Sequence, residues 1–319
     1  MTDFALIGVG GYVAPLHMKA INETGGCLVA AIDKHDSVGI MDSYFPNTEF
    51  FTEFYRFDRY IDLLQNDSTR KSVEYVSICS PNNLHDSHIK FALRSEADAI
   101  CEKPTVLNPW HVASLSEMEK ETGKRIFTIL QLRLHPTIKL LSEKVVKSST
   151  DNLHEVEINY ITARGRWYLH SWKGSEEKSG GIATNLGIHL FDMLIQVFGK
   201  VNNCIIHTRE SNRVAGTLEL EKAKVRWFLS IDELDLPAAT RLRSLRIFRS
   251  ILIDGEELDF STGFNDLHTE SYKEILAGRG FGLEDVYNSI NLTSLIRTCK
   301  IDGWDTDSLN WRKNISNLD

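Results

Sequence analysis

The 319-residue sequence has no excess of basic residues, no long hydrophobic run and no cysteine pattern. Its 36 Lys and Arg are outnumbered by 44 Asp and Glu, so the formal net charge is −8. A chain with this charge balance is not attracted as a whole to nucleic acid or to an anionic membrane surface. We therefore expect neither as a partner, and any basic binding site must be local.

No apolar run approaches the roughly 20 residues that a membrane-spanning helix needs. The first residues read as a strand and lack the basic leader of a secretory signal. The five cysteines are scattered, with neither C-x-x-C spacing nor a disulfide framework. These absences predict a cytoplasmic protein.

The first 130 residues alternate short apolar runs with amphipathic stretches. We expect strands at 4–9, 28–32, 75–80, 98–101 and 125–130, separated by helices at 13–23, 56–65, 84–95 and 109–122. This βαβ order predicts an N-terminal Rossmann domain, a doubly wound parallel sheet with helices on both faces.

After residue 130 the pattern changes to long alternating stretches. We expect a helix near 135–148, strands at 156–162, 224–231 and 245–254, one strong helix at 185–198, and further helices near the C-terminus. This pattern predicts a C-terminal α+β domain with a mostly antiparallel open sheet. The whole is an α/β protein with one domain at 1–130 and a second at 131–319. The motifs and the resemblance given below imply that the first domain binds NAD and that the second is for substrate binding and oligomerisation.

A glycine-rich turn follows the first expected strand and opens the first helix. Gly8 allows the tight turn, Gly10 lets the backbone approach a pyrophosphate, and Ala14 is the small residue where helix meets strand. A tight turn without a ligand is the alternative. Asp33 ends the second strand, where a dinucleotide fold places the acid that binds the adenosine ribose; a solvated aspartate is the alternative. A carboxylate there repels a 2′-phosphate and favours NAD over NADP, and the following Lys34 and His35 can soften that preference.

Two further turns follow expected strands. Ser80, Pro81, Asn82 and His85 lie at the carboxyl edge of the sheet, where ligands bind, although His85 is equally explained as a capping or packing residue. Lys103, in Glu-Lys-Pro, can orient a substrate hydroxyl and assist its deprotonation; in isolation it reads as a surface lysine.

The expected helix at 185–198 places Asn185, His189 and Asp192 at i, i+4 and i+7, on one face. A lone histidine among apolar neighbours is usually a hydrogen-bonded core residue. Between Asn and Asp on the same face, His189 is also a candidate acid/base.

A local basic stretch, 164–173, contains Arg164, Arg166, His170 and Lys173 and no acid. Arginine pairs bidentately with phosphates and carboxylates, so this stretch suits a substrate that carries both. A solvated basic loop is the alternative.

The glycine turn, the Ser-Pro-Asn turn, Glu-Lys-Pro and the Gly-Gly…Gly-x-His-x-x-Asp segment resemble, in order and separation, the Gfo/Idh/MocA oxidoreductase family over essentially the whole chain. The resemblance implies that Lys103 and His189 flank the reacting carbon of a sugar or cyclitol and the nicotinamide. The family most often has Asp where Asn185 stands. Because an amide cannot accept a proton, His189 is implied as the base.

The segments 129–133, 160–168, 171–174 and 183–185 resemble a subgroup that oxidises the C3 hydroxyl of UDP-N-acetylglucosaminuronic acid (UDP-GlcNAcA) for O-antigen synthesis. This likeness implies NAD as cofactor, no metal, a homo-oligomer, and a 2-oxo acid as candidate acceptor for reoxidising NADH. Another sugar or cyclitol dehydrogenase and a non-catalytic NAD-binding regulator are the alternatives.

The expected cofactor-binding residues are Gly8, Gly10, Gly11, Tyr12, Val13, Asp33, Ser80, Pro81, Asn82, His85, Glu102, Lys103, Gln131 and Trp172. The expected substrate-binding residues are Arg164, Tyr168, Ser171, Lys173, Thr184, Asn185 and His189, of which Asn185 and His189 are also expected, with Lys103, to be catalytic. Trp167, Tyr168 and Trp172 offer rings that can stack on a uracil, sugar or nicotinamide face.

Overall fold

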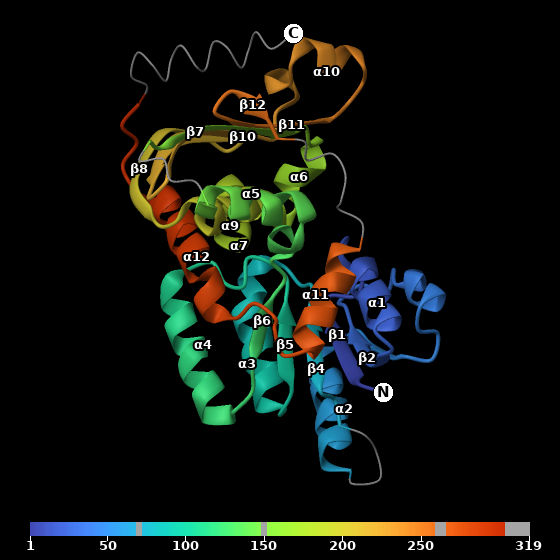
Figure 1. Ribbon diagram of the computed structural model, residues 1–319. Coiled ribbons are helices and arrows are strands. Elements are labelled where there is room, and N and C mark those ends of the chain that lie inside the picture. The colour runs from blue at the N-terminus through green and yellow to red at the C-terminus, as the bar shows by residue number, and fades with distance from the viewer. Residues whose placement is uncertain (68–71, 148–151, 259–265, 304–319) are drawn as a thin grey trace. The chain divides into compact units, whose positions relative to one another are not determined.

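A computed structural model of the protein describes residues 1–67, 72–147, 152–258 and 266–303 (Figure 1). The chain divides into two compact units, each described here by itself. The first comprises Met1–His135 and Phe264–Tyr287, and the second Pro136–Gly263 and Asn288–Asp319. The expected division at residue 130 did not include the second segment of the first unit, to which the chain returns at Phe264–Tyr287.

The first unit contains a six-stranded sheet of order β3-β2-β1-β4-β5-β6, in which every pair is parallel. Its strands are β1 Asp3–Ile7, β2 Cys27–Ile32, β3 Glu49–Phe51, β4 Tyr75–Ile78, β5 Asp98–Cys101 and β6 Ile126–Thr128. This is the predicted doubly wound order, with its switch point between β1 and β4. The short strand β3 was not expected from the sequence.

Helices cover both faces of this sheet, which is why β1 is buried along its whole length. They are α1 Ala14–Glu23, α2 Phe54–Asn66, α3 His85–Arg94, α4 Pro109–Thr122 and the returning helix α11 Leu267–Leu276. Helix α11 packs against α1, and its Tyr272 joins the core formed by Phe4, Met18 and Ile21. Short 3₁₀ turns occur at Gly39–Ser43, Asn82–Leu84 and Gln131–Leu134.

The second unit contains a six-stranded sheet of order β12-β11-β7-β10-β9-β8. Its strands are β7 His154–Thr162, β8 Val201–Arg209, β9 Arg213–Leu220, β10 Ala223–Ser230, β11 Ile247–Ile253 and β12 Glu256–Glu257. All neighbours are antiparallel except β7 and β10, so the prediction of a mostly antiparallel sheet is confirmed. Strands β8 and β9 were missed in the sequence.

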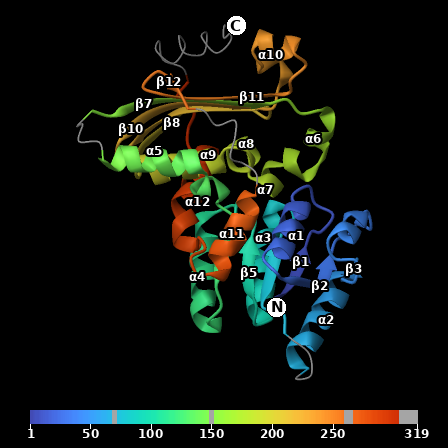
Figure 2. The ribbon, with the colours of Figure 1, turned by 45° about the vertical axis from the view of Figure 1, so that its right-hand side comes forward.

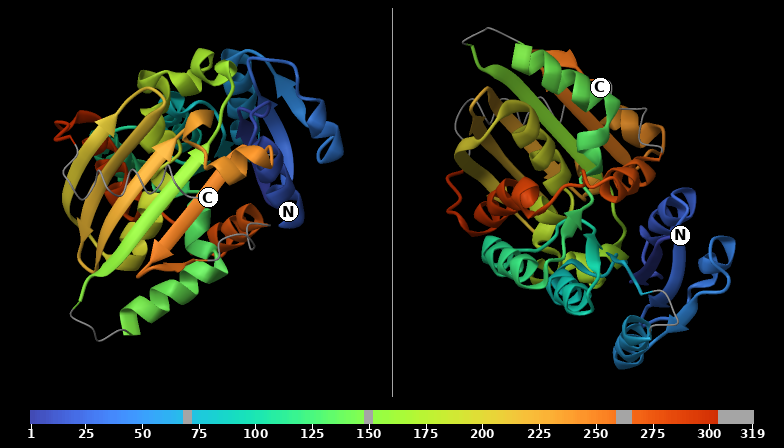
Figure 3. Two further views of the ribbon diagram at one scale, coloured as in Figure 1. Left: turned by 90° about the horizontal axis from the view of Figure 1, so that it is seen from above. Right: turned by 60° about the horizontal axis from the view of Figure 1, so that its bottom comes forward.

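Helices α5 Pro136–Lys147 and α9 Ile188–Phe198 lie along one face of this sheet (Figure 2). Trp227 of β10 packs edge-to-face on Phe191 of α9, with ring centroids 5.1 Å apart. The strands are seen from the opposite face in Figure 3, left. The unit also includes the short helices α6 Arg166–His170, α7 Glu176–Ser179, α8 Gly181–Asn185 and α10 Ala238–Leu242, and part of α12 Leu283–Thr298.

The expectation of one helix over 185–198 is wrong. Helix α8 ends at Asn185 and α9 begins at Ile188, and the helical stretches on either side of this break meet at 46°. A Cβ at Gly187, between them, would lie 2.6 Å from both the Ala183 carbonyl oxygen and a Leu229 methyl group. The chain is thus pressed against β10 at the break, and Asn185 does not continue the helical face of His189.

Within the described residues, no single helix is long and apolar enough to cross a membrane; only the bent pair around this break meets the length and composition requirement together.

Candidate active site

The glycine turn brings the ends of β1 and β4 together. Gly8 has a φ of +89°, and a Cβ there would lie 2.8 Å from the Cys79 carbonyl carbon and the Ser80 nitrogen. A Cβ at Gly11 would lie 3.0 Å from the Gly8 oxygen. Neither position has room for a side chain. The turn therefore exposes backbone in front of α1, while Tyr12 beside it is 90% exposed.

Asp33 is held by backbone groups on both carboxylate oxygens. Oδ2 accepts from the Gly10 N–H at 3.0 Å, and Oδ1 accepts from the His35 N–H at 3.0 Å. The carboxylate at the end of β2 is thereby tied to the glycine turn. This orientation suits the predicted role toward ribose hydroxyls.

His85 is completely buried, and both of its ring nitrogens face backbone carbonyls. Nε2 lies 2.8 Å from the Ser80 oxygen, and Nδ1 lies 2.7 Å from the Pro104 oxygen. Burial lowers the pKa of His85, against the influence of these carbonyls. His85 thus ties the turn after β4 to the turn after β5, which favours the packing alternative over direct cofactor contact.

Near His85, Asn82 is buried and Pro81 is half-buried. Ser80 is also buried, and its Oγ lies 2.8 Å from Nδ1 of His88.

Glu102 of the Glu-Lys-Pro turn is buried in a cluster that the sequence did not reveal. Its Oε1 lies 3.0 Å from Nε2 of His17 and 2.9 Å from Nε2 of His268, and its Oε2 accepts from the Lys103 N–H at 3.2 Å. His17 comes from α1 and His268 from α11. No local motif links them to Glu102, because 85 and 166 residues of sequence separate them from it.

The buried groups around the glycine turn fit a dinucleotide. Without side chains at Gly8, Gly10 and Gly11, a pyrophosphate can approach the backbone at the N-terminal end of α1. Asp33 is oriented for a ribose. In addition, Oε1 of Gln131, just beyond β6, is buried and has no hydrogen-bond partner among the described residues. A bound cofactor with a polar donor at that edge would supply the missing partner.

In the second unit, Asn185 and Tyr168 form a hydrogen bond between α8 and α6. Asn185 Nδ2 donates to Tyr168 Oη at 2.7 Å. Burial raises the pKa of Tyr168, which is 3% exposed. Thr184 is buried, and its Oγ1 has no partner within the described part of the chain. His189 is half-buried near the start of α9.

The basic stretch is not a loop throughout, because it includes α6 and a 3₁₀ turn at Trp172–Gly174. Lys173 lies between two aromatic rings, with Nζ 5.7 Å from the centroids of Trp167 and of Trp172. Burial and the charge of Arg164 lower the pKa of Lys173. Trp172 was expected to contact the cofactor, but its ring contacts the Lys173 ammonium group of its own unit.

The other members of the stretch differ in exposure. Arg164, Arg166 and His170 are exposed, whereas Ser171 is half-buried and its hydroxyl donates to the Tyr168 carbonyl at 2.7 Å.

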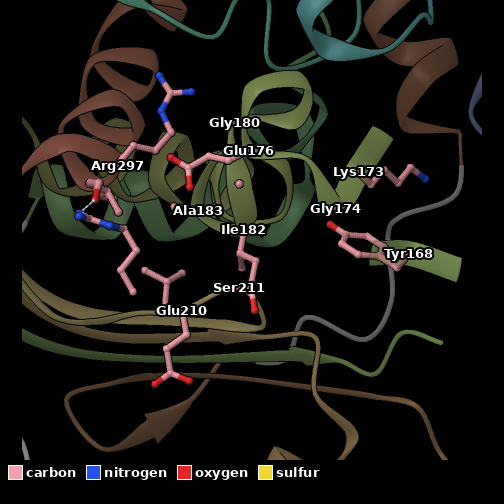
Figure 4. Close-up of a pocket in the computed structure, with 14 residues that line it drawn as sticks. Tyr168, Lys173, Gly174, Glu176, Gly180, Ile182, Ala183, Glu210, Ser211 and Arg297 are labelled. Carbon is pink, nitrogen blue, oxygen red and sulfur yellow. Dashed lines mark hydrogen bonds between the residues drawn. The ribbon is translucent and has the colours of Figure 1, made fainter. Parts of the chain in front are cut away.

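A pocket of about 180 Å³ lies within the second unit (Figure 4). Tyr168 and Lys173 line one end, and Glu176 and Arg297 the other. Because Glu176 contributes negative charge, the pocket is not purely cationic. It includes two of the expected substrate-binding residues but neither Asn185 nor His189.

Two solved structures resemble the chain over nearly its full length. They are complexes of the WlbA (WbpB) dehydrogenase from Thermus thermophilus, one with NAD and α-ketoglutarate and one with NAD and UDP-GlcNAcA. Each is 47% identical in sequence, has a TM-score of 0.92, and covers 97% of this chain and 98% of that chain.

The curated relatives match less of the chain. D-glucoside 3-dehydrogenase of Escherichia coli is 27% identical over 130 residues, which is 40% of this chain. The chain spans between 36% and 59% of the length of the curated relatives that it matches.

Family models agree with this likeness in both units. The model of the GFO_IDH_MocA oxidoreductase family, NAD-binding Rossmann fold, matches residues 2–130. The model of that family's C-terminal alpha/beta domain matches residues 146–236. Together they cover more than half of the chain, which therefore belongs to the Gfo/Idh/MocA family of NAD-binding oxidoreductases, as its motifs predicted.

Proposed function

We propose that the protein catalyses the NAD-dependent oxidation of the C3 hydroxyl of UDP-GlcNAcA to a ketone, in nucleotide-sugar synthesis for O-antigen. The observation that carries this proposal is the 47% identity, over 97% of the chain, to a dehydrogenase solved with NAD and UDP-GlcNAcA. When bound, NAD accepts the hydride from C3.

The proposal assigns three roles to the chain's own side chains. His189 accepts the hydroxyl proton, Lys103 hydrogen-bonds the developing oxyanion, and Asn185 helps to hold the sugar. The contact between Asn185 and Tyr168 supports the last role. The Asn185 amide nitrogen donates to Tyr168, another residue of the proposed substrate-binding set, so the position of the Asn185 side chain is fixed beside that residue.

The anionic parts of the substrate are assigned to the basic stretch. Arg164 is exposed, and the lowered pKa of Lys173 has Arg164 among its causes, so the two cations lie close enough to interact. Tyr168, Ser171 and Thr184 complete the proposed substrate-binding set. The Thr184 hydroxyl has no hydrogen-bond partner among the residues that the structure describes, which supports its inclusion. Each charge-assisted contact to a phosphate or carboxylate contributes about 1.5–3 kcal/mol.

A turnover screen tests the proposal. UDP-GlcNAcA, UDP-N-acetylglucosamine and free inositol are compared, and both ketone formation and nicotinamide absorbance are measured. UDP-N-acetylglucosamine has an alcohol in place of the C6 carboxylate and so lacks one charge-assisted contact. We expect its kcat/KM to be lower by about 10- to 100-fold. Equal kcat/KM for acid and alcohol, or faster oxidation of inositol, would contradict the assigned substrate.

We further propose that a 2-oxo acid reoxidises NADH and that the protein is a cytoplasmic homo-oligomer. The α-ketoglutarate complex of the Thermus thermophilus dehydrogenase supports the first point. We expect the enzyme to make multiple turnovers only when α-ketoglutarate is added. If α-ketoglutarate does not raise turnover, it is not the acceptor that reoxidises NADH. Light scattering of the purified protein tests the oligomer, since a monomeric mass would exclude it.

A further inference from the structure

The first unit contains a buried cluster of ionisable side chains to which the proposed function gives no role. Its members are His17 of α1, Glu102 after β5 and His268 of α11. All three are buried, and the two imidazole rings lie edge to face with centroids 5.2 Å apart. The cluster joins elements near the start, middle and end of the chain.

The hydrogen bonds of this cluster have one consistent direction. Glu102 faces three donors, the Nε2–H groups of the two histidines and the Lys103 N–H, so its carboxylate acts as acceptor throughout. Nδ1 of His17 is then an acceptor for the Tyr272 hydroxyl at 2.8 Å, and Tyr272 accepts from Ser77 at 2.6 Å. In this arrangement each of these hydrogen bonds has one donor and one acceptor.

The protonation states agree with these directions. Burial by itself raises the pKa of Glu102, but hydrogen bonds from His17 and His268 outweigh it, and the pKa of the carboxyl lies well below its usual range. Burial lowers the pKa of His17, which favours the neutral ring. The carboxylate is thus charged, buried and held from two helices.

A metal ion is the other ligand that two histidines and a glutamate suggest. Such an ion needs a ligand atom from each side chain at about 2.0–2.2 Å. Here both histidines point Nε2 at the same carboxylate oxygen, at ordinary hydrogen-bond lengths of 3.0 and 2.9 Å. The geometry is that of donors on one acceptor.

We propose that Glu102, clamped by His17 and His268, is a positioning residue for Lys103. The clamp holds the backbone N–H of Lys103 and so determines where the side chain of this proposed catalytic lysine begins. Because His17 lies on the helix that follows the glycine turn, the clamp also ties the Glu-Lys-Pro turn to the cofactor turn. This inference rests on the proposed function for the role of Lys103 but not for the geometry.

The experiment compares two variants of His268 in the full-length protein. His268→Leu removes the N–H donor and puts an apolar side chain in its place. His268→Gln keeps an N–H donor. The control is His207→Leu, which removes a buried histidine of the second unit whose Nδ1 pairs with the Gly303 oxygen at 2.6 Å. Turnover, the NAD dissociation constant and thermal stability are measured for each.

A displaced catalytic group costs about 10²-fold in rate, so His268→Leu is expected to lower kcat by about 10- to 100-fold. The NAD dissociation constant stays within about twofold, because backbone N–H groups and Asp33 bind the dinucleotide. His268→Gln restores most of kcat, and His207→Leu lowers stability without lowering kcat. Wild-type kcat in His268→Leu, or equal losses in His268→Leu and the control, would overturn the inference.

A second measurement does not depend on turnover. The rate at which an amine-reactive ester labels Lys103 is followed by peptide mass spectrometry in the protein without cofactor. His268→Leu is expected to change this rate and His268→Gln to restore it. If UDP-GlcNAcA is not oxidised but labelling changes in this way, the substrate assignment fails and the positioning role stands.

Two further outcomes are decisive. If His268→Leu does not fold, the nearly isosteric Glu102→Gln is used, since an amide cannot accept from all three donors. Unchanged labelling in that variant would overturn the inference. Activity that is lost with a chelator and recovered with Zn²⁺ would show that the cluster binds metal instead.

Discussion

Asp33 shows how a single side chain is prepared for a ligand. Its two oxygens are oriented by the N–H groups of Gly10 and His35. The Asp33 carboxylate is thus fixed in place by a hydrogen bond to the glycine turn. At this scale the carboxylate and the proposed catalytic Lys103 have separable roles, and substitution tests them separately.

Asp33→Ala is expected to weaken NAD binding and to narrow the gap in affinity between NAD and NADP. The change removes ribose hydrogen bonds together with a charge that repels a 2′-phosphate. Dissociation constants for both cofactors, measured by calorimetry, check this. Asp36→Ala, three residues further on, is the control with the same change of charge. If Asp33→Ala and Asp36→Ala bind both cofactors alike, Asp33 is not in the site.

Lys103→Ala is expected to keep NAD binding and lose turnover by about 10²- to 10⁴-fold, the range for acid–base and oxyanion contributions. In the proposed function the lysine acts on the substrate oxygen, so its loss is expected to lower turnover far more than the affinity for NAD. Lys120→Ala, an exposed lysine of α4, is the control. Steady-state kinetics decide the point, and a near-normal kcat for Lys103→Ala would remove it from the catalytic set.

At the scale of elements, the break between α8 and α9 is the feature that repositions the expected site residues. The sequence suggested one helix because the apolar periodicity continues across the break. Tertiary contacts override that local signal, since the backbone at Gly187 lies against Leu229 of β10 and Phe191 of α9. Asn185 consequently ends one helix and pairs with Tyr168, while His189 belongs to the next.

Gly187→Ala is expected to destabilise the protein, because its Cβ would lie 2.6 Å from a backbone oxygen and a methyl group. Overpacking of this kind costs about 1–3 kcal/mol. Gly39→Ala is the control, as no atom lies within 4 Å of its Cβ position and its φ is not positive. Denaturant titration of both variants measures the difference. Equal stability of the two would show that the break does not depend on close packing.

At the scale of the whole molecule, buried and half-buried histidines link the free energy of unfolding to pH. Burial, followed by the charge of nearby His85, lowers the pKa of His88 from 6.5 to about 4. Between these values the unfolded chain binds more protons than the folded one, so stability falls as pH falls. Burial lowers the pKa values of His17 and His85 in the same direction.

The free energy of unfolding is therefore expected to drop between pH 7 and pH 5, with His88 contributing about 2 kcal/mol of the loss. His88→Gln should reduce the loss by about that amount, while His170→Gln, at an exposed position of the second unit, should leave it unchanged. Urea titrations at pH 7 and pH 5 measure the free energy of unfolding of wild type and both variants. A pH dependence that is the same in His88→Gln and wild type would refute the assignment.

The order of strands and helices in the first unit was predictable because each element has its own local signal. Strands β8 and β9 were missed since they carry partly exposed and irregular patterns instead of clean alternation. The sequence of Phe264–Tyr287 has a helical pattern, but nothing in it indicates that this segment packs in the first unit. Its packing on α1 joins surfaces that are far apart in the sequence and meet only in the folded first unit.

By itself, the sequence determined the glycine turn, the acid after β2 and the Glu-Lys-Pro turn, because these depend on backbone conformation and spacing over a few residues. Only the tertiary structure decided that Asn185 and His189 lie on different helices, that His85 joins two turns, and that His17 and His268 enclose Glu102. Such contacts unite residues far apart in the chain. Burial then determines which of their groups are charged, and no local pattern encodes that burial.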